Sequence, residues 1–192
     1  MRSPSTVLAV LVLVVELTGS SLASPFVLFP KAGELHSPDG RYVVRNAERT
    51  APTTEFVGIS HSLWLIDVAT QRSRKLCDYL GVVAVAWSGN DYVVMTEYVA
   101  KKTSRARVFP VAEFGEAVVL DKTTLFHALP AESRDRLEES DHVFVEASHL
   151  EGGILFLHVW GNGPHDREGF RWACAYALRE GTLHCTEHLP TW

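Results

Sequence analysis

Apolar and polar residues alternate in short runs along most of the chain. Valine, isoleucine, leucine and aromatic residues form runs of five to eight positions, separated by polar, glycine-containing stretches. Runs of this length and type, bounded by turn residues, predict β-strands. One stretch differs: residues 130–140 (PAESRDRLEES) begin with proline and place Glu132 and Arg136 four apart, which predicts a short exposed helix. The chain is therefore expected to be all-β with one short inserted helix, to which residues 123–129 could add a turn.

Residues 35–44 (LHSPDGRYVV) contain the clearest turn. In residues 37–40 (SPDG), proline restricts φ to about −65° at the second turn position, and glycine accepts a positive φ at the fourth. One strand is expected to end at Leu35-His36, and the next to run from Arg41 to Asn46. Residues 62–76 (SLWLIDVATQRSRKL) then predict a second strand, turn and strand, with the turn at residues 69–71.

The same pattern returns about fifty residues later. Residues 85–94 (VAWSGNDYVV) repeat the strand, turn and Tyr-Val-Val triplet of residues 42–44, and residues 104–120 add two further strands. A weaker copy begins at Val143. The chain is therefore interpreted as three four-stranded antiparallel units, at residues 34–77, 82–120 and 142–186. Four strands in about 40 residues are typical of a β-propeller blade. The alternative is a β-sandwich whose hairpins are alike by chance.

The first unit resembles the β-propeller repeat of periplasmic Tol-system proteins and of prolyl-oligopeptidase-type propeller domains. The matching residues are Ser37, Pro38, Asp39, Gly40, Leu63, Trp64, Asp67 and Thr70, while Gln71 stands where glycine is usual. The second unit keeps Trp87 and Ser88, and the third keeps little. The resemblance implies a blade-like fold and no particular function.

Three units are fewer than the four to eight blades of a closed propeller. An open array, a homodimer whose two chains complete a ring of six units, or a third unit that is not a blade would resolve the difference. The Gly-x-Ser-x-Gly turn of a serine hydrolase is missing from the sequence; residues 58–62 (GISHS) come closest and lack the second glycine. The resemblance therefore does not extend to peptidase activity.

The first 23 residues have the pattern of an export signal. Arg2 precedes an unbroken apolar run from Val7 to Val15, and Ser21-Leu22-Ala23 offers a cleavage site. The run is shorter than the roughly 20 residues that span a bilayer. We expect residues 1–23 to be removed, leaving residues 24–192 as a single periplasmic or secreted domain without a membrane span. A retained N-terminal anchor is the alternative.

The net charge of −5 and the scarcity of basic clusters argue against a nucleic-acid partner. Lys101, Lys102, Arg105 and Arg107 form the densest basic group, and we expect them on the solvated face of a hairpin.

Cysteine usage leaves two possibilities open. Cys174 and Cys185 flank a turn, and an oxidising compartment would allow them to form a disulfide. However, a two-residue turn at Glu180-Gly181 would place Tyr176, not Cys174, opposite Cys185. Buried free thiols, Cys77 included, are the alternative.

Histidines and one glycine-rich loop provide the candidates for ligand binding. His184 and His188 lie in a strand-like run where four residues span about 13 Å, too far for one zinc ion. The loop that contains Trp160, Asn162, His165 and Asp166 could hold a ligand, or could be a plain hairpin connection.

The remaining candidates have simpler readings. We expect the aspartates near turns to cap them rather than bind calcium, Glu138-Glu139 to lie on an exposed helix, and two tryptophans to lie in the core. These aspartates are Asp39, Asp67, Asp91 and Asp121, and the tryptophans are Trp64 and Trp87.

No residue is assigned a catalytic, cofactor-binding or metal-binding role, and no cofactor is expected. The sequence favours a binding or interaction module at the cell envelope that contacts a protein or small-molecule partner through loops at one end of the units. The alternative is a small secreted hydrolase whose acid and base residues, such as His165 and Asp166, meet only in the fold.

Overall fold

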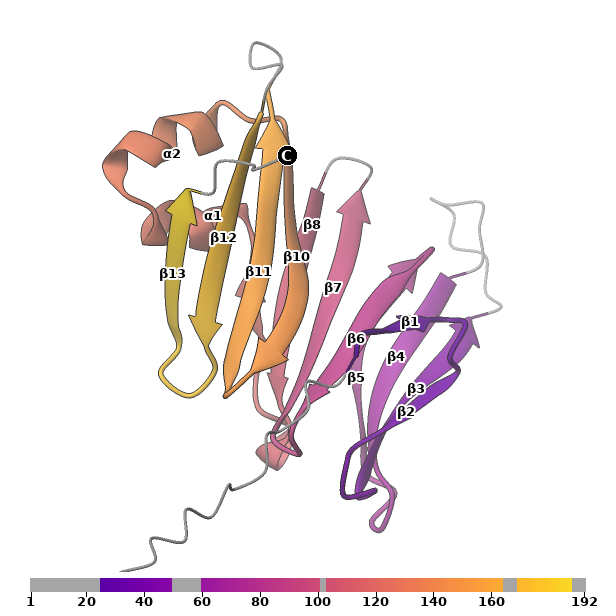
Figure 1. The fold of residues 1–192 in the computed structure, drawn as a ribbon. Helices are drawn as coiled ribbons and strands as arrows, with labels where there is room; N and C mark the ends of the chain where they lie inside the picture. Colours follow the sequence, from indigo (N-terminus) through magenta and orange to yellow (C-terminus); the bar gives the residue numbers. More distant parts are fainter. Residues whose placement is uncertain (1–24, 50–59, 101–102, 164–168, 188–192) are drawn as a thin grey trace, which may run out of the picture.

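A computed structural model describes residues 25–49, 60–100, 103–163 and 169–187 (Figure 1). Within these ranges the chain forms two β-sheets and two short α-helices, so the all-β class is confirmed. Neither of these helices is long and apolar enough to cross a membrane.

The smaller sheet coincides with the first predicted unit. Its strands are β2 (Glu34–His36), β3 (Tyr42–Arg49), β4 (Ser60–Asp67) and β5 (Ser73–Leu80), antiparallel and in chain order. The turn between β2 and β3 is closed by the backbone N–H of Gly40, which donates to the carbonyl of Ser37 at 2.9 Å. Gly40 has φ +71°, as the SPDG pattern predicts.

The larger sheet holds nine strands and contains the second and third predicted units. They are β1 (Val27–Phe29), β6 (Val83–Ser88), β7 (Tyr92–Ala100), β8 (Thr103–Pro110), β9 (Val118–Leu120), β10 (His142–Glu151), β11 (Ile154–Asn162), β12 (Phe170–Ala177) and β13 (Thr182–Glu187). Strands β6–β9 and β10–β13 are each antiparallel, and β8 meets β10 in a short parallel contact at Thr103 and Val143. The propeller resemblance itself stays a prediction.

Two helices, not one, stand between β9 and β10. Helix α2 (Ala131–Glu138) follows Pro130 as predicted, and α1 (Lys122–Ala128) precedes it. The Asp121 carboxylate caps α1 by accepting from the N–H groups of Thr123 and Thr124, both at 3.0 Å. The prediction of a single helix was wrong because this cap extends a short apolar stretch into seven helical residues.

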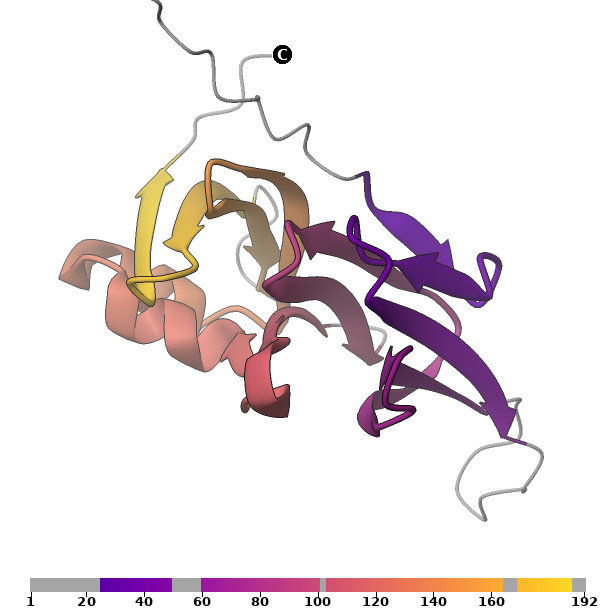
Figure 2. The same cartoon turned by 90° about the horizontal axis from the view of Figure 1, so that it is seen from below.

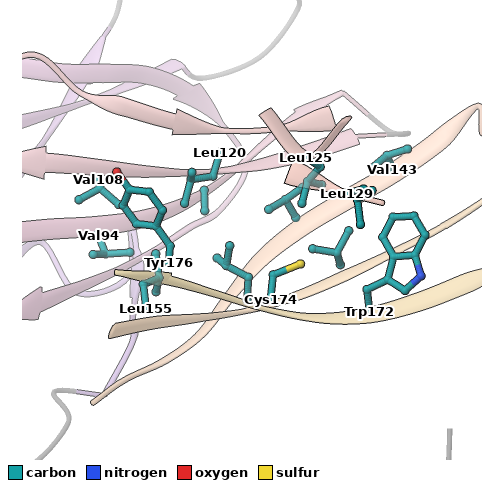
Figure 3. Close-up of a cluster of buried hydrophobic side chains, with 14 of the residues drawn as sticks. Val94, Val108, Leu120, Leu125, Leu129, Val143, Leu155, Trp172, Cys174 and Tyr176 are labelled. Carbon is teal, nitrogen blue, oxygen red and sulfur yellow. The ribbon is translucent and has the colours of Figure 1, made fainter. Parts of the chain in front are cut away.

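Strands β6, β7 and β8 form a middle layer that is buried on both faces. Val85, Trp87 and Met95 pack against the smaller sheet. From the same strands, Ala86 and Val94 point the other way, into a cluster with α1 and strands β10–β12 (Figure 3). Figure 2 shows β10–β13 curving around this second cluster, with the helices closing its open side.

Two buried hydroxyl groups attach β10 to the middle layer. Ser104 Oγ accepts from the N–H of Val145 at 2.9 Å and donates to the carbonyl of the same residue at 3.2 Å. Thr96 Oγ1 accepts from the N–H of Ala147 at 2.9 Å. Side chains thus provide the hydrogen bonds that a regular ladder would provide beyond the single parallel contact.

The cysteine question is settled by the turn after β12. Ala177 pairs with Thr182, so four residues lie in the turn, and Cys174 faces Cys185 directly. These two cysteines form a disulfide, and Cys77 is a buried free thiol. The prediction that Tyr176 faces Cys185 was wrong, because it assumed a two-residue turn.

Two other expectations were also wrong. Trp87 is buried and donates to the carbonyl of Leu35 at 3.2 Å, but Trp64 points away from its buried neighbours in β4 and is half-buried on the outer face. Arg105 and Arg107 are not on a solvated face: both contact the buried carboxylate of Glu97, at 2.8 and 3.6 Å. Lys101 and Lys102 lie outside the described residues.

Ser104→Ala should destabilise the protein markedly. The substitution leaves the buried N–H and carbonyl of Val145 without a hydrogen-bond partner. Each unsatisfied group lowers the free energy of unfolding by about 1–3 kcal/mol. We expect unfolding free energy to fall by at least about 2 kcal/mol in urea titrations. Ser73→Ala, on the exposed side of β5, is the control and should change it by less than about 0.5 kcal/mol. Equal effects of the two variants would contradict the role of the hydroxyl.

Gln71→Gly should stabilise the protein. Gln71 adopts φ +57°, a left-handed conformation that costs a residue with a Cβ about 1 kcal/mol and costs glycine little. We expect a rise in melting temperature of roughly 2–4 °C, measured by calorimetry. Arg72→Gly, at the next residue and without a positive φ, should lower it. A lower melting temperature for Gln71→Gly would show that the turn does not depend on this conformation.

Candidate functional site

The outer face of β10 and β11 carries three aromatic residues that lie outside the core, Phe144, Phe156 and Trp160. Val143, Val145, Leu157 and Val159 point into the cluster shown in part in Figure 3. Because side chains alternate along a strand, the residues between them point outward. These outward residues are Phe144, Glu146, Phe156, His158 and Trp160.

A β-bulge at Ser148 brings the outward residues of the two strands onto one face. Glu151 pairs with Ile154 beside the Gly152-Gly153 turn, but beyond the bulge Ala147 pairs with Leu157, a shift of one residue. Without that shift Trp160 would lie opposite Val145, and one of the two strands would turn its aliphatic residues outward. With it, Phe144 lies opposite Trp160.

Glu146 is the centre of this group. Its Oε1 accepts from the hydroxyl of Tyr98 on β7 at 2.7 Å, and its Oε2 accepts from the indole N–H of Trp160 at 3.4 Å. The Trp160 ring stacks on Phe144, with centroids 4.0 Å apart and planes at 15°. We call Tyr98, Phe144, Glu146 and Trp160 the Glu146 surface. Three strands therefore hold one carboxylate among three aromatic rings.

The Glu146 surface is open to solvent. Tyr98 is 47% exposed and Trp160 is 38% exposed. Both side chains are large, and both remain exposed although each donates a hydrogen bond to Glu146. Aromatic residues on a protein surface mark contact sites when they cluster in this way. Their hydrogen bonds and ring stacking hold them in place before any partner arrives.

Apolar side chains extend the surface across the larger sheet. Phe29 on β1 faces the smaller sheet, so its neighbour Leu28 points to the opposite side, the side of Tyr98. Val82 directly precedes Val83, which pairs with Glu97 beside Tyr98. Leu28 is 54% exposed and Val82 is 46% exposed. The Glu146 surface therefore has an apolar margin on β1 and immediately before β6.

The pKa of the Tyr98 phenol is raised to about 12. Partial burial is the largest cause, followed by the hydrogen bond to Glu146 and the negative charge of that carboxylate. Each of these disfavours the phenolate. The Tyr98 hydroxyl therefore remains a hydrogen-bond donor throughout the physiological pH range.

A concave feature lies at the opposite ends of the strands. A cleft of about 580 Å³ is formed by the turns after β6, β10 and β12. Asp91, Arg179 and Glu180 stand in its wall, and Tyr92 is the one aromatic residue in its lining. With charges of both signs and a single ring, this cleft offers less for specific recognition than the Glu146 surface.

The sequence-predicted candidates are distributed over both ends of the molecule. Trp160 belongs to the Glu146 surface and Asn162 lies two residues further along β11; His165, Asp166 and His188 lie outside the described residues. His184 is exposed on β13, and Glu138 and Glu139 are exposed at the end of α2.

Three of the four aspartates cap turns or a helix, as predicted. Asp39 accepts from the N–H of Arg41, and Asp67 from those of Ala69 and Thr70, all at 3.0 Å. Hydrogen bonds lower the pKa of both carboxyls. The largest cause is the hydroxyl of Ser37 for Asp39 and the backbone N–H of Thr70 for Asp67. Asp121 caps α1, and Asp91 lines the cleft.

The sequence analysis did not find Tyr98, Phe144 and Glu146. Alternation in residues 142–151 and 154–162 shows that each strand has an outward set, but the bulge that aligns the two sets has no marker in the sequence. Tyr98 is about fifty positions from Glu146 and belongs to a different predicted unit.

Comparisons of the chain with protein-family models, with curated proteins and with solved structures found no match.

Stability should fall as the pH rises from about 10 to about 12. A tyrosine whose pKa is higher in the folded state than in the unfolded state stabilises the fold at lower pH, and that contribution is lost as the pH passes from the unfolded to the folded pKa. Burial raises the pKa of Tyr98 to about 12, and it also raises those of Tyr79 and Tyr176. Urea titrations at increasing pH would measure the loss.

Glu146→Gln should reduce this alkaline loss, because the variant removes the charge that opposes the Tyr98 phenolate. Tyr98→Phe should reduce it further, because the titrating group is gone. The same pH dependence in the wild-type protein and in Tyr98→Phe would contradict the assigned coupling.

Proposed function

We propose that this chain is a binding protein of the cell envelope and that a partner protein docks on the Glu146 surface. The observation that carries the proposal is the ordered aromatic group around Glu146, exposed on the outer face of β10 and β11. Tryptophan and tyrosine are the residues most often found where binding energy concentrates in protein interfaces. Export to an oxidising compartment is supported by the apolar run after Arg2 and by the Cys174–Cys185 disulfide.

The arrangement favours a macromolecular partner over a small molecule. The surface takes its residues from β7, β10 and β11 and continues into exposed apolar side chains at Leu28 and Val82. Rings fixed by stacking and hydrogen bonds lose little side-chain entropy on binding, which favours affinity. A pre-ordered aromatic group of this extent suits another protein surface.

A photocrosslinker in place of Val82 tests the proposal in the cells that produce the protein. Val82 lies at the margin, so the four residues of the Glu146 surface remain intact. We expect a discrete adduct with another protein, identified by mass spectrometry, and its loss when Trp160→Ala is added to the same chain. With the purified partner, Trp160→Ala should weaken binding by about 2 kcal/mol, roughly thirtyfold.

Thr186 is the control position, since it is exposed on the same sheet but lies on β13, three strands from β10. The proposal is wrong if no adduct forms at Val82, if the same adduct forms at Thr186, or if it survives Trp160→Ala. An adduct with a second copy of this chain would show that the partner is the same protein and that the surface forms a homodimer. Light scattering of residues 24–192 would then give twice the monomer mass.

A further inference from the structure

Glu146 is a charged group without a counter-charge. No arginine, lysine or histidine lies within ion-pair distance of its carboxylate in the described part of the chain. Its two hydrogen-bond donors, the phenol of Tyr98 and the indole of Trp160, are neutral. His158 lies opposite Glu146 in the register, and no ion pair joins the two. The negative charge thus faces solvent amid aromatic rings.

The two neutral donors leave part of the carboxylate free. An ionised carboxylate has about four acceptor positions on its two oxygens. Tyr98 uses one position on Oε1 and Trp160 uses one on Oε2, so each oxygen keeps capacity for a further donor. Because the two donors approach different oxygens, they also hold the carboxylate in a fixed orientation.

Docking of a purely apolar partner would be unfavourable here. Such a partner would bury the carboxylate without a counter-ion, and the lost hydration of the charge would oppose binding. A cation reverses the sign of this effect, because it neutralises Glu146 and is attracted to the faces of nearby aromatic rings. The charge of −5 on the whole chain would add a weak long-range attraction.

From this arrangement we propose that Glu146 receives an arginine side chain of the docked partner. A guanidinium donates two parallel N–H groups and fits the two free oxygen positions of a carboxylate, and it stacks on aromatic rings. Leu28 and Val82 would contact apolar residues that flank the arginine. This inference rests on the proposed function and identifies what the Glu146 surface recognises.

The experiment uses purified protein labelled with ¹⁵N and three capped tripeptides with leucine on either side of arginine, lysine or citrulline. We expect the arginine peptide to shift the indole N–H signal of Trp160 at millimolar concentration. Citrulline has the same shape without the charge, so its peptide should bind at least about tenfold more weakly, since each tenfold corresponds to about 1.4 kcal/mol. The lysine peptide should lie between the two, because it lacks the fork of donors.

Glu146→Gln should weaken binding of the arginine peptide at least about tenfold, whereas Glu146→Asp should recover part of it by keeping the charge. Glu138→Gln on exposed α2 is the control and should bind like the wild-type protein. Circular dichroism of each variant would confirm that the fold is intact. Equal binding of the arginine and citrulline peptides, or unchanged binding in Glu146→Gln, would overturn the inference.

Two further results would be decisive. No shift of the Trp160 indole signal at about 10 mM arginine peptide, a concentration that detects even very weak binding, would overturn it. Choline is a small cation without N–H donors; if it binds as well as the arginine peptide, the surface recognises a quaternary ammonium group and the assignment to a protein side chain is wrong. If the Val82 adduct forms and depends on Trp160 but the purified partner binds Glu146→Gln as well as wild type, the proposed function holds and this inference fails.

Discussion

Burial of both faces of strands β6, β7 and β8 is the constraint on which the rest of the structure depends. Val85, Trp87 and Met95 require the smaller sheet on one side, and Ala86 and Val94 require β10–β13 with α1 on the other. The sequence of a strand buried on both faces is nearly continuous in apolar residues, as in residues 83–87 and 92–95. On the second face, Ser104 and Thr96 bond the backbone of β10, which therefore lies close to β7 and β8.

That close approach also determines the geometry of the Glu146 surface. Ser104 and Thr96 hold the backbone of β10 over the middle layer, and this brings Glu146 within 2.7 Å of the Tyr98 hydroxyl. The bulge at Ser148 then orients β11 so that Trp160 reaches the same carboxylate. The surface is therefore a product of long-range packing, because its residues come from segments that local structure alone would not bring together.

Local pattern predicted the strands and first turns well, and it failed where a single residue decides the register. Residues 37–40 and 69–71 contain their turns as expected, and the three predicted units begin and end within a few residues of strand groups. The pairing of Cys174 with Cys185 depends on four residues in a turn rather than two, and the Phe144–Trp160 pair depends on one bulge. The alternation of apolar and polar residues does not reveal the length of this turn or the presence of the bulge, because the period of two is the same with either register.

The disulfide affects how readily the last strands of the sheet can aggregate. Strand β12 (FRWACAYA) combines high β-propensity with one charged residue, a composition that pairs readily with other chains when its edge is open. Strand β13 covers that edge, and the link between Cys174 and Cys185 prevents β13 from peeling away on its own. Local opening at this edge of the sheet is thereby tied to a larger and rarer unfolding event. The bond therefore keeps the edge of β12 covered and lowers the risk of aggregation, in addition to any effect on the free energy of unfolding.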